Sequence, residues 1–459
     1  SNNPLSNDQR GTSRPQADAC DIGSFEFEPV VPAGPLQTLI DAAPPGATID
    51  VPDGVYNEPI TIGDGKTLLG SSANNVVINV SNPGVSAITA TGDFTLKGVR
   101  VTGGNSASNG GGIIAKVAGT NITLIDVLFD NNNAALDGGA IYLLNGTITA
   151  INVTFSNNHA DGNGGAILGG MSSTIDINAT LFESNTSIFS GGAIFNEGNM
   201  SITDTTITNS NSGSGGGVYN SGSGLLDVVG TTFSNNTATD SGITAGGAIA
   251  GAGTIDIRNS TLSGNSTVGN GGGIGLTGGT ARLNNVTLAF NASSGLGGPF
   301  FADTGALIEF SNSLLSDNTS DADNCGNVTS LGYNLFQNAI CQPVASDIID
   351  EPLIGLLADN GGPTLTHALD PISPAIDAAN PGQLVIELAS ALSASQLSFN
   401  GVAGERGGNL VPVSGEFVAG SVFASAPDEG PFDLDGSFST QFSFQITDPV
   451  AWSGAPSEH

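Results

Sequence analysis

Basic residues are scarce in this chain. Nine Lys and Arg residues stand against 42 Asp and Glu residues, and the formal net charge is −33. A surface with this charge repels the phosphates of nucleic acids and the headgroups of anionic membranes. Hydrophobic runs of about 18 residues, the length that crosses a bilayer as a helix, are also missing. We therefore expect no nucleic-acid partner and no membrane insertion.

Cysteine is rarer still, with three residues in all. Cys325 and Cys341 lie in one Asn- and Gly-rich segment and are candidates for a disulfide, whereas Cys20 has no nearby partner. The chain opens with polar residues instead of a signal peptide. Together with the abundance of Asn, Thr, Ser and Gly, this favours a processed chain that is secreted to the extracellular space or the cell surface.

Glycine is abundant, with 67 residues, and much of it lies in a repeat. Gly-Gly followed by a small and an aliphatic residue recurs about every 26 residues. The aliphatic positions are Ile113, Ile141, Ile167, Ile194, Val218, Ile249 and Ile274, with a degenerate Phe300. A second series with the same period comprises Phe129, Phe155, Phe182, Ile207, Phe233, Leu262, Leu288 and Leu315. Two series with one period indicate a single repeating structural unit.

Short segments within each unit alternate apolar and polar residues between Gly and Asn turns, which is the pattern of half-buried strands. In one unit these segments are Ala140–Tyr142, Thr147–Ile151 and Val153–Phe155. Strands this short bury a face only by stacking on their equivalents in the next turn, about 4.8 Å away. We predict an all-β fold, a right-handed parallel β-helix with three short strands per turn.

Asparagine recurs three residues after the second series, and Ser210 is the exception. We expect the amides, stacked in register, to form a structural ladder that satisfies backbone groups of the turns. The residues of this ladder are Asn132, Asn158, Asn185, Asn236, Asn265, Asn291 and Asn318. The alternative, a ligand-binding row, is disfavoured because a row inside the coil does not meet solvent.

The two ends of the chain differ from the repeats. Residues 36–43 have helical periodicity and stop at Pro44-Pro45-Gly46, so we predict a helix that covers the open N-terminal end of the core. Glu416–Val418 and Phe438–Ile446 carry strand signals with turns between them. We predict a smaller, antiparallel β-region over residues 381–459.

Several motifs resemble known families. Leu36 to Leu69 resembles the first turn of pectin-lyase-like β-helix proteins, and the Gly-Gly-Ala-Ile and Phe-x-x-Asn repeats resemble those of polymorphic outer-membrane adhesins. Leu331–Leu335, Asp359–Leu369 and Ser373–Asp377 are similar to motifs of bacterial surface proteins of the choice-of-anchor Q type. With the repeats, these motifs cover roughly residues 36–380, and the resemblance implies a β-helix over that range.

The order of one segment departs from that family. In such surface proteins a segment similar to residues 8–26 follows the Ser-Pro-Ala-Ile-Asp motif and completes the C-terminal end of the coil, whereas here it stands at the N-terminus. A cysteine that the family often has before this segment is missing, which leaves Cys20 without its partner.

Geometry limits where this segment docks. The residues between Glu28 and Leu36 span at most about 25 Å, and about a dozen turns separate the coil ends by roughly 50 to 60 Å. We therefore expect residues 1–28 to complete a neighbouring subunit, which yields a head-to-tail homopolymer. The expected contact residues are Asp8, Arg10, Arg14, Cys20, Ile22 and Phe25. The alternative is that residues 1–28 are the tail of a preceding tandem unit.

Candidate chemistry is sparse. Pectin-lyase-like folds often carry enzymes, but the basic residues that hold an acidic sugar are few and widely spread here. A hydrolase needs two carboxyl groups close together, and the strand carboxylates show no clustered partner in the sequence: Asp126, Asp176, Asp204, Asp227 and Asp256. We expect no enzyme, no metal centre at the three His residues, and no cofactor. Calcium at residues 317–324 or 433–436 is a weaker alternative.

These observations favour a structural subunit of an extracellular bacterial filament. The alternatives are a monomeric cell-surface adhesin and, less favoured, a polysaccharide lyase or hydrolase. A carbohydrate or cell-surface contact is compatible with the preferred function. The predicted organisation is an N-terminal donor segment (1–28), a β-helix (29–380) and a C-terminal β-region (381–459).

Overall fold

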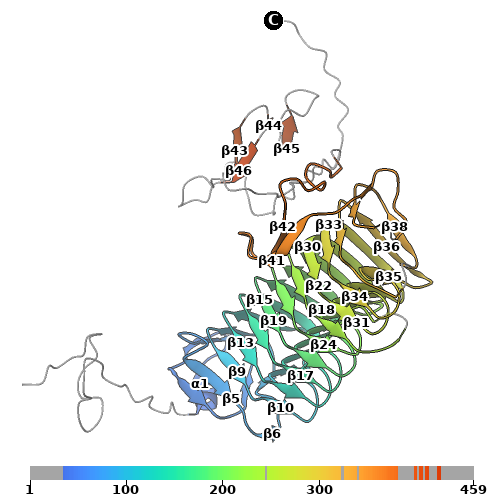
Figure 1. Cartoon of the computed structure of the whole chain (residues 1–459). Helices are drawn as coiled ribbons and strands as arrows, with labels where there is room; N and C mark the ends of the chain where they lie inside the picture. Colours follow the sequence, from blue (N-terminus) through green and yellow to red (C-terminus); the bar gives the residue numbers. More distant parts are fainter. Residues whose placement is uncertain are drawn as a thin grey trace, which may run out of the picture. The chain divides into compact units, whose positions relative to one another are not determined.

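Figure 1 shows the computed structural model of the chain, coloured along the sequence. The structure describes residues 35–242, 245–321, 325–338 and 341–380, together with four short strands between residues 397 and 424. It divides into two units, Ser1–Ala379 and Asn380–His459, and each is described by itself. The predicted contact residues Asp8, Arg10, Arg14, Cys20, Ile22 and Phe25 lie outside the described residues.

The first unit is a parallel β-helix of about ten turns, which confirms the predicted fold class. Each turn supplies strands to three faces, and every strand pairs in parallel with its equivalent in the next turn. Figure 1 shows the stacked strands from β5 to β38. Backbone hydrogen bonds therefore run along the coil axis, and side chains alternate between the core and the outside.

In the repeating turns, the strand of the first face follows the Gly-Gly pair. Its strands are β3 Ile60–Ile62, β7 Ile88–Ala90, β11 Ile113–Ala115, the start of β15 Ile141–Ile151 and of β18 Ile167–Asn178, β21 Ile194–Asn196, β25 Val218–Asn220, β29 Ile249–Gly251, β32 Ile274–Leu276 and β35 Phe300–Ala302. The predicted aliphatic series lies in register here, from Ile113 opposite Ile141 to Ile274 opposite Phe300. These side chains are fully buried.

The second face follows the next corner. Its strands are β1 Thr48–Asp50, β4 Lys66–Leu69, β8 Phe94–Lys97, β12 Thr120–Ile125, the later parts of β15 and β18, β22 Asn199–Thr203, β26 Leu225–Val229, the starts of β30 Thr254–Ser263 and β33 Gly279–Ala289, β36 Ala306–Ser311 and β38 Val328–Ser330.

The third face holds the second predicted series. Its strands are β2 Gly54–Tyr56, β5 Val76–Asn79, β9 Arg100–Thr102, β13 Leu128–Asp130, β16 Thr154–Ser156, β19 Leu181–Glu183, β23 Thr206–Thr208, β27 Thr232–Ser234, the ends of β30 and β33, β37 Leu314–Ser316, β39 Leu335–Phe336 and β40 Ile348–Ile349. Phe129, Phe155 and Phe182 are fully buried and stack with ring centroids 5.1 and 4.7 Å apart. Each contributes about 1.5–3 kcal/mol by leaving water.

A fourth row of two-residue strands was not predicted. It comprises β6 Pro83–Gly84, β10 Asn105–Ser106, β14 Asn133–Ala134, β17 His159–Ala160, β20 Thr186–Ser187, β24 Asn211–Ser212, β28 Thr237–Ala238, β31 Ser266–Thr267 and β34 Ala292–Ser293. Two residues carry too little alternation for a pattern to reveal them, so only the stacking of turns shows that they are strands.

Some predicted strand boundaries are wrong. Ala140–Tyr142 and Thr147–Ile151 were expected as separate strands, but β15 runs through both from Ile141 to Ile151. The corner is a bulge: the register with β18 shifts between Leu143 and Asn145, and pairing then resumes. Gly and Asn at this corner therefore bend a continuous strand instead of ending it.

The N-terminal end of the core is covered by helix α1, Leu36–Ala42, as predicted. Leu36 and Ile40 point into the core and are 0% and 2% exposed. The Glu58 carboxylate accepts hydrogen bonds from the backbone N–H groups of Leu36 and Gln37, which satisfies the first turn of the helix. This helix has 7 residues, and no helix in the described ranges is long enough to cross a bilayer.

The parallel coil ends before residue 380, the boundary expected from the sequence. β40 is its last strand, and Leu353 then adopts a positive φ of 52°. The chain continues into an antiparallel hairpin, β41 Ile354–Ala358 and β42 Thr366–Leu369. In the second unit β43 Leu397–Asn400 pairs with β46 Ser421–Ala424, and β44 Ala403–Arg406 pairs with β45 Asn409–Pro412, both antiparallel. The strands expected at 416–418 and 438–446 lie outside the described residues.

The Gly-Gly pair lies at a tight corner of the repeating turns, and steric contacts explain why these positions are glycine. The first glycine has a positive φ, 65° at Gly164, and a Cβ there would lie 2.3 Å from the Ile167 carbonyl oxygen. A Cβ on the second, Gly165, would lie 2.0 Å from the carbonyl oxygen of Gly192 in the next turn. Both positions therefore exclude any side chain.

We expect Gly165→Ala to destabilise the coil by at least about 1–3 kcal/mol, because the new methyl group separates two hydrogen-bonded turns. Gly222→Ala is the matched control, since Gly222 is exposed and a Cβ there meets nothing within 4 Å. Thermal unfolding followed by circular dichroism measures both variants. Equal melting temperatures for the two variants would contradict the steric explanation of the repeat.

Candidate functional site

The predicted asparagine ladder is present inside the corner between the third face and the fourth row. The Asn158 side chain donates to Phe129 O and to Asn185 Oδ1, both at 3.0 Å. Its Oδ1 accepts from the backbone N (3.1 Å) and the Nδ2 (3.0 Å) of Asn132. The same bonds link Asn236, Asn265, Asn291 and Asn318. Asn158 is fully buried, so the row stabilises the turns and does not face a ligand.

Ser210 interrupts the ladder between its two halves. Its hydroxyl donates to Thr208 O at 3.3 Å, and its backbone N–H donates to Asn236 Oδ1 at 3.0 Å. Asn185, on the other side of the gap, donates to Phe155 O at 2.8 Å. A serine side chain is too short to supply the amide bonds that the other turns make.

A second, shorter amide pair was not predicted. Asn196 and Asn220 end two adjacent first-face strands, and Asn196 Nδ2 donates to Asn220 Oδ1 at 2.8 Å. Both residues are fully buried. Their shared place after an aliphatic and an aromatic residue was the signal in the sequence, but two occurrences are too few to define a series.

The candidate disulfide joins Cys325 and Cys341, whose Cα atoms are 5.3 Å apart. Both residues are 5% exposed and belong to the last turns of the core. The bridge ties the loop after β37 to the segment before β40. Its place is structural, because it secures the turns at the end of the coil where no further turn stacks on them.

Outward-facing side chains of the second face form a charged row. Asp176 lies opposite Ser201, Ser201 opposite Asp227, and Asp227 opposite Asp256. The row continues through Arg282 and Glu309. The expectation that these carboxylates have no clustered partner is therefore wrong for Asp227 and Asp256, whereas Asp176 lies opposite Thr149 and Ser201. Stacking in register makes neighbours of residues that are a full turn or more apart in the sequence.

Asp126 and Asp204 lie elsewhere, at the corner between the second and third faces. Both have a positive φ, 55° and 49°, which Asp tolerates better than most residues. Asp126 Oδ1 accepts a hydrogen bond from Asn152 Nδ2 at 2.7 Å. Burial raises the pKa of Asp204 above its usual value. These two carboxylates are corner residues.

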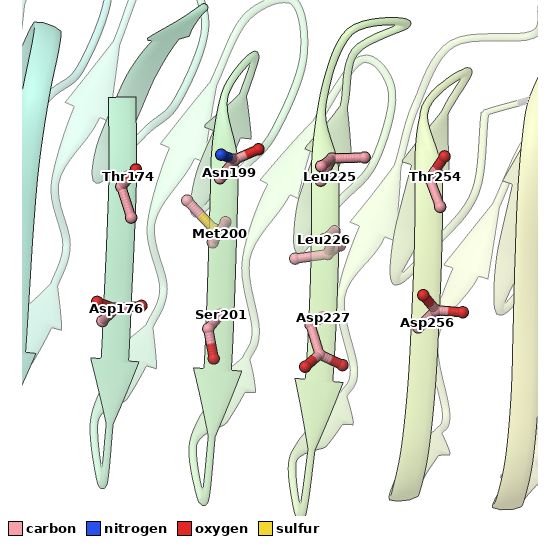
Figure 2. Close-up of a pocket in the computed structure, with 10 residues that line it drawn as sticks. All are labelled: Thr174, Asp176, Asn199, Met200, Ser201, Leu225, Leu226, Asp227, Thr254 and Asp256. Carbon is pink, nitrogen blue, oxygen red and sulfur yellow. The ribbon is translucent and has the colours of Figure 1, made fainter. Parts of the chain in front are cut away.

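A groove of about 280 Å³ lies on the second face beside the charged row. Figure 2 shows Asp176, Ser201, Asp227 and Asp256 side by side on four adjacent strands. A parallel row on the same strands consists of Thr174, Asn199, Leu225 and Thr254. Leu225 is half exposed, and the buried Met200 and Leu226 also line the groove, which therefore combines carboxylates, hydroxyls, an amide and apolar side chains.

Two arginines partly neutralise the charged row. Arg258 Nη2 lies 2.8 and 2.9 Å from the two carboxylate oxygens of Asp227, and Arg282 Nε lies 3.3 Å from Glu309 Oε2. Such exposed pairs contribute only about 0.2–1 kcal/mol each. The groove offers hydrogen-bond acceptors to hydroxylated or cationic groups, but it is open along the face and does not exclude water.

Metal-binding geometry is absent from the described ranges, where no three His, Cys, Asp or Glu side chains are grouped to hold an ion. In the candidate calcium segment, Asp317 accepts from Ser316 Oγ at 2.7 Å and from Gln337 Nε2 at 3.1 Å. Residues 322–324 and 433–436 lie outside the described residues. His159 contacts Thr186 and Asp161 on the fourth row.

The hairpin β41–β42 covers the outside of the third face over its later turns. Thr232 Oγ1 donates to Leu365 O at 2.6 Å, and Thr364 Oγ1 donates to Gly230 O at 2.9 Å. His367 Nδ1 lies 2.7 Å from Gly355 O, and its Nε2 lies 2.9 Å from Ser263 Oγ. These bonds fix His367 as the tautomer protonated on Nδ1.

Two segments of the coil resemble a known repeat. Residues 126–143 and 152–170 match the Chlamydia polymorphic membrane protein repeat. Each segment contains the buried phenylalanine, the ladder asparagine and the Gly-Gly corner of one turn. No curated protein and no solved structure matches the chain. The repeat and the β-helix fit the adhesin-like resemblance, whereas the choice-of-anchor Q and pectin-lyase-like resemblances stay predictions.

We expect Ser210→Asn to stabilise the protein by about 0.5–1.5 kcal/mol, because the new amide joins the two halves of the ladder. Asn158→Leu should destabilise it by about 1–3 kcal/mol for each buried group left unpaired. Ser156→Asn, on the outside of the third face, is the control and should change little. Urea unfolding measures all three. A Ser210→Asn variant that is less stable than the parent would contradict the idea that the gap in the ladder costs stability.

We expect the hairpin to dock less tightly as the pH falls. Burial lowers the pKa of His367 below the usual value of 6.5, although the bond to Gly355 O opposes this shift. Because the undocked imidazole binds protons more readily, docking is complete above pH 6.5 and weakens as the pH falls through the lowered pKa. The pH dependence of docking is measured by the hydrogen-exchange protection of the β42 amides. His367→Gln should remove this pH dependence, and its persistence in that variant would contradict the assignment.

Proposed function

We propose that this chain is a surface-exposed, adhesin-like structural subunit that assembles head to tail into an extracellular bacterial filament. The β-helix and its polymorphic-membrane-protein-like repeats support the surface and adhesin-like part of this proposal. The low content of basic residues supports an extracellular partner that is neither a nucleic acid nor an anionic membrane.

The main support for head-to-tail assembly is the difference between the two ends of the coil. At the N-terminal end, α1 closes the core with Leu36 and Ile40. In the final turns Leu331, Val344 and Ile349 are 57%, 44% and 53% exposed. An apolar end of this kind is a surface on which a further segment stacks.

Residues 1–28 are the proposed occupant of that end, supplied by a neighbouring subunit. The residues between Glu28 and Leu36 reach at most about 25 Å, and about ten turns separate the two ends by roughly 50 Å. Docking on the C-terminal end of the same coil is thus out of reach. A contact of this type is heterologous and open, so its repetition produces a fibre.

We also propose that the charged row is a binding surface and not a catalytic centre. The support is the engagement of Asp227 by Arg258 and the open groove beside it, which leaves water in contact with any ligand. The row nevertheless has the two-carboxylate composition of a glycoside hydrolase, which is the second candidate function. We propose, in addition, that the protein functions without a cofactor.

Deletion of residues 1–28 tests the assembly. The truncated protein should fold and stay monomeric, while the full chain forms fibres visible by negative-stain electron microscopy. A free peptide of residues 1–28 should bind the truncated protein, and a peptide with the same residues in scrambled order should not. Fibres of the truncated protein would refute donation by this segment, as would a full chain that stays monomeric.

A further inference from the structure

The outer side of the first face carries an apolar and aromatic column that the function proposed above does not use. Ile114 lies opposite Tyr142, Tyr142 opposite Leu168, Leu168 opposite Phe195, and Phe195 opposite Tyr219. We call these five residues the aromatic ridge. The rings of Phe195 and Tyr219 stack 5.2 Å apart at an interplanar angle of 2°. Leu168, between two aromatic neighbours, is only 6% exposed.

The ridge ends where the column continues with residues that have a small side chain or none. The next members after Tyr219 are Ala250 and Gly275. A Cβ on Gly275 would lie 2.7 Å from the backbone N of Gly246, so the longer corner before β29 covers this part of the face. The ridge is therefore a bounded surface over the turns from β11 to β25.

The charge around the ridge is negative. Asp137 and Glu197 both lie close enough to Tyr142 to raise its pKa, after the larger effect of burial. Burial and then the Asp137 carboxylate raise the pKa of Glu197. Two carboxylates that repel each other beside partly exposed aromatic rings favour a cationic group between them.

This negative charge disfavours several of the ligands that an apolar surface could bind. A second copy of the chain or an acidic polymer would bring further negative charge to the same place, which costs free energy. The ridge lies on internal strands whose backbone groups are paired along the coil, so an extended peptide cannot add as a strand.

We propose that the aromatic ridge binds a linear polysaccharide that carries free amino groups. The sugar rings lie along the column from Tyr142 to Tyr219, and the ammonium groups meet Asp137 and Glu197. A repeating polymer suits a surface whose side chains repeat about every 4.8 Å. The ridge is present in a single subunit, so this proposal stands whether or not the chain forms filaments.

Calorimetric titration of the full chain tests the proposal with four probes: a glucosamine hexasaccharide, its N-acetylated form, a galacturonic acid hexasaccharide and hexalysine. The glucosamine oligomer should bind, the N-acetylated form should bind more weakly, and the galacturonate should not bind. Binding of hexalysine as tight as that of the glucosamine oligomer would overturn the proposal, because charge alone would then explain it.

Variants of the ridge complete the test. Phe195→Ala with Tyr219→Ala should weaken glucosamine binding about tenfold, whereas Val55→Ala, an exposed apolar residue of the third face, should not change it. Glu197→Gln should weaken it about two- to fivefold and leave binding of the N-acetylated form unchanged. This single variant keeps the test valid if the double variant does not fold. Unchanged affinity in Glu197→Gln, or in a folded double variant, would refute the ridge as the site.

Discussion

Hydrogen bonding between the backbones of successive turns is the interaction on which the rest of this structure depends. It requires each turn to lie about 4.8 Å from the next along its whole circumference. The turns approach one another closely at the Gly-Gly corner, where a Cβ on Gly139 would lie 2.1 Å from the carbonyl oxygen of Gly165. The buried Phe column and the asparagine ladder both follow from this spacing, because equal turns place equal residues on top of one another.

The same register that builds the core also builds the outer surface. Inward positions accept few residue types, because they must fill a dry, narrow space. Outward positions are free of that constraint, and they have become different on each face: a charged row with a groove on the second, an aromatic ridge on the first. A binding surface on this fold is thus a column of residues from several turns, and no single segment of the chain contains it.

The ends and the sides of the coil are finished in different ways. Helix α1 closes the N-terminal end with Leu36 and Ile40, whereas Ile349 and its neighbours leave apolar surface at the other. The hairpin β41–β42 covers the third face through Thr232 and Ser263, which are small enough to let it approach. One end of the core and one face of the coil are thus closed by two separate elements, helix α1 and the hairpin.

By itself, the sequence determined the repeat, the inward columns such as Phe155 and Asn158, helix α1 and the Cys325–Cys341 pair. The repeat and its inward columns depend on spacing that recurs from turn to turn, and helix α1 and the cysteine pair depend on short local segments, so the sequence reveals them. Only the tertiary structure decided that Asp176, Asp227 and Asp256 share a row, that Phe195 stacks on Tyr219, and that His367 docks against Ser263. Loops of unequal length separate these residues, and outward positions carry no repeating pattern, so only the register of the stacked turns brings them together.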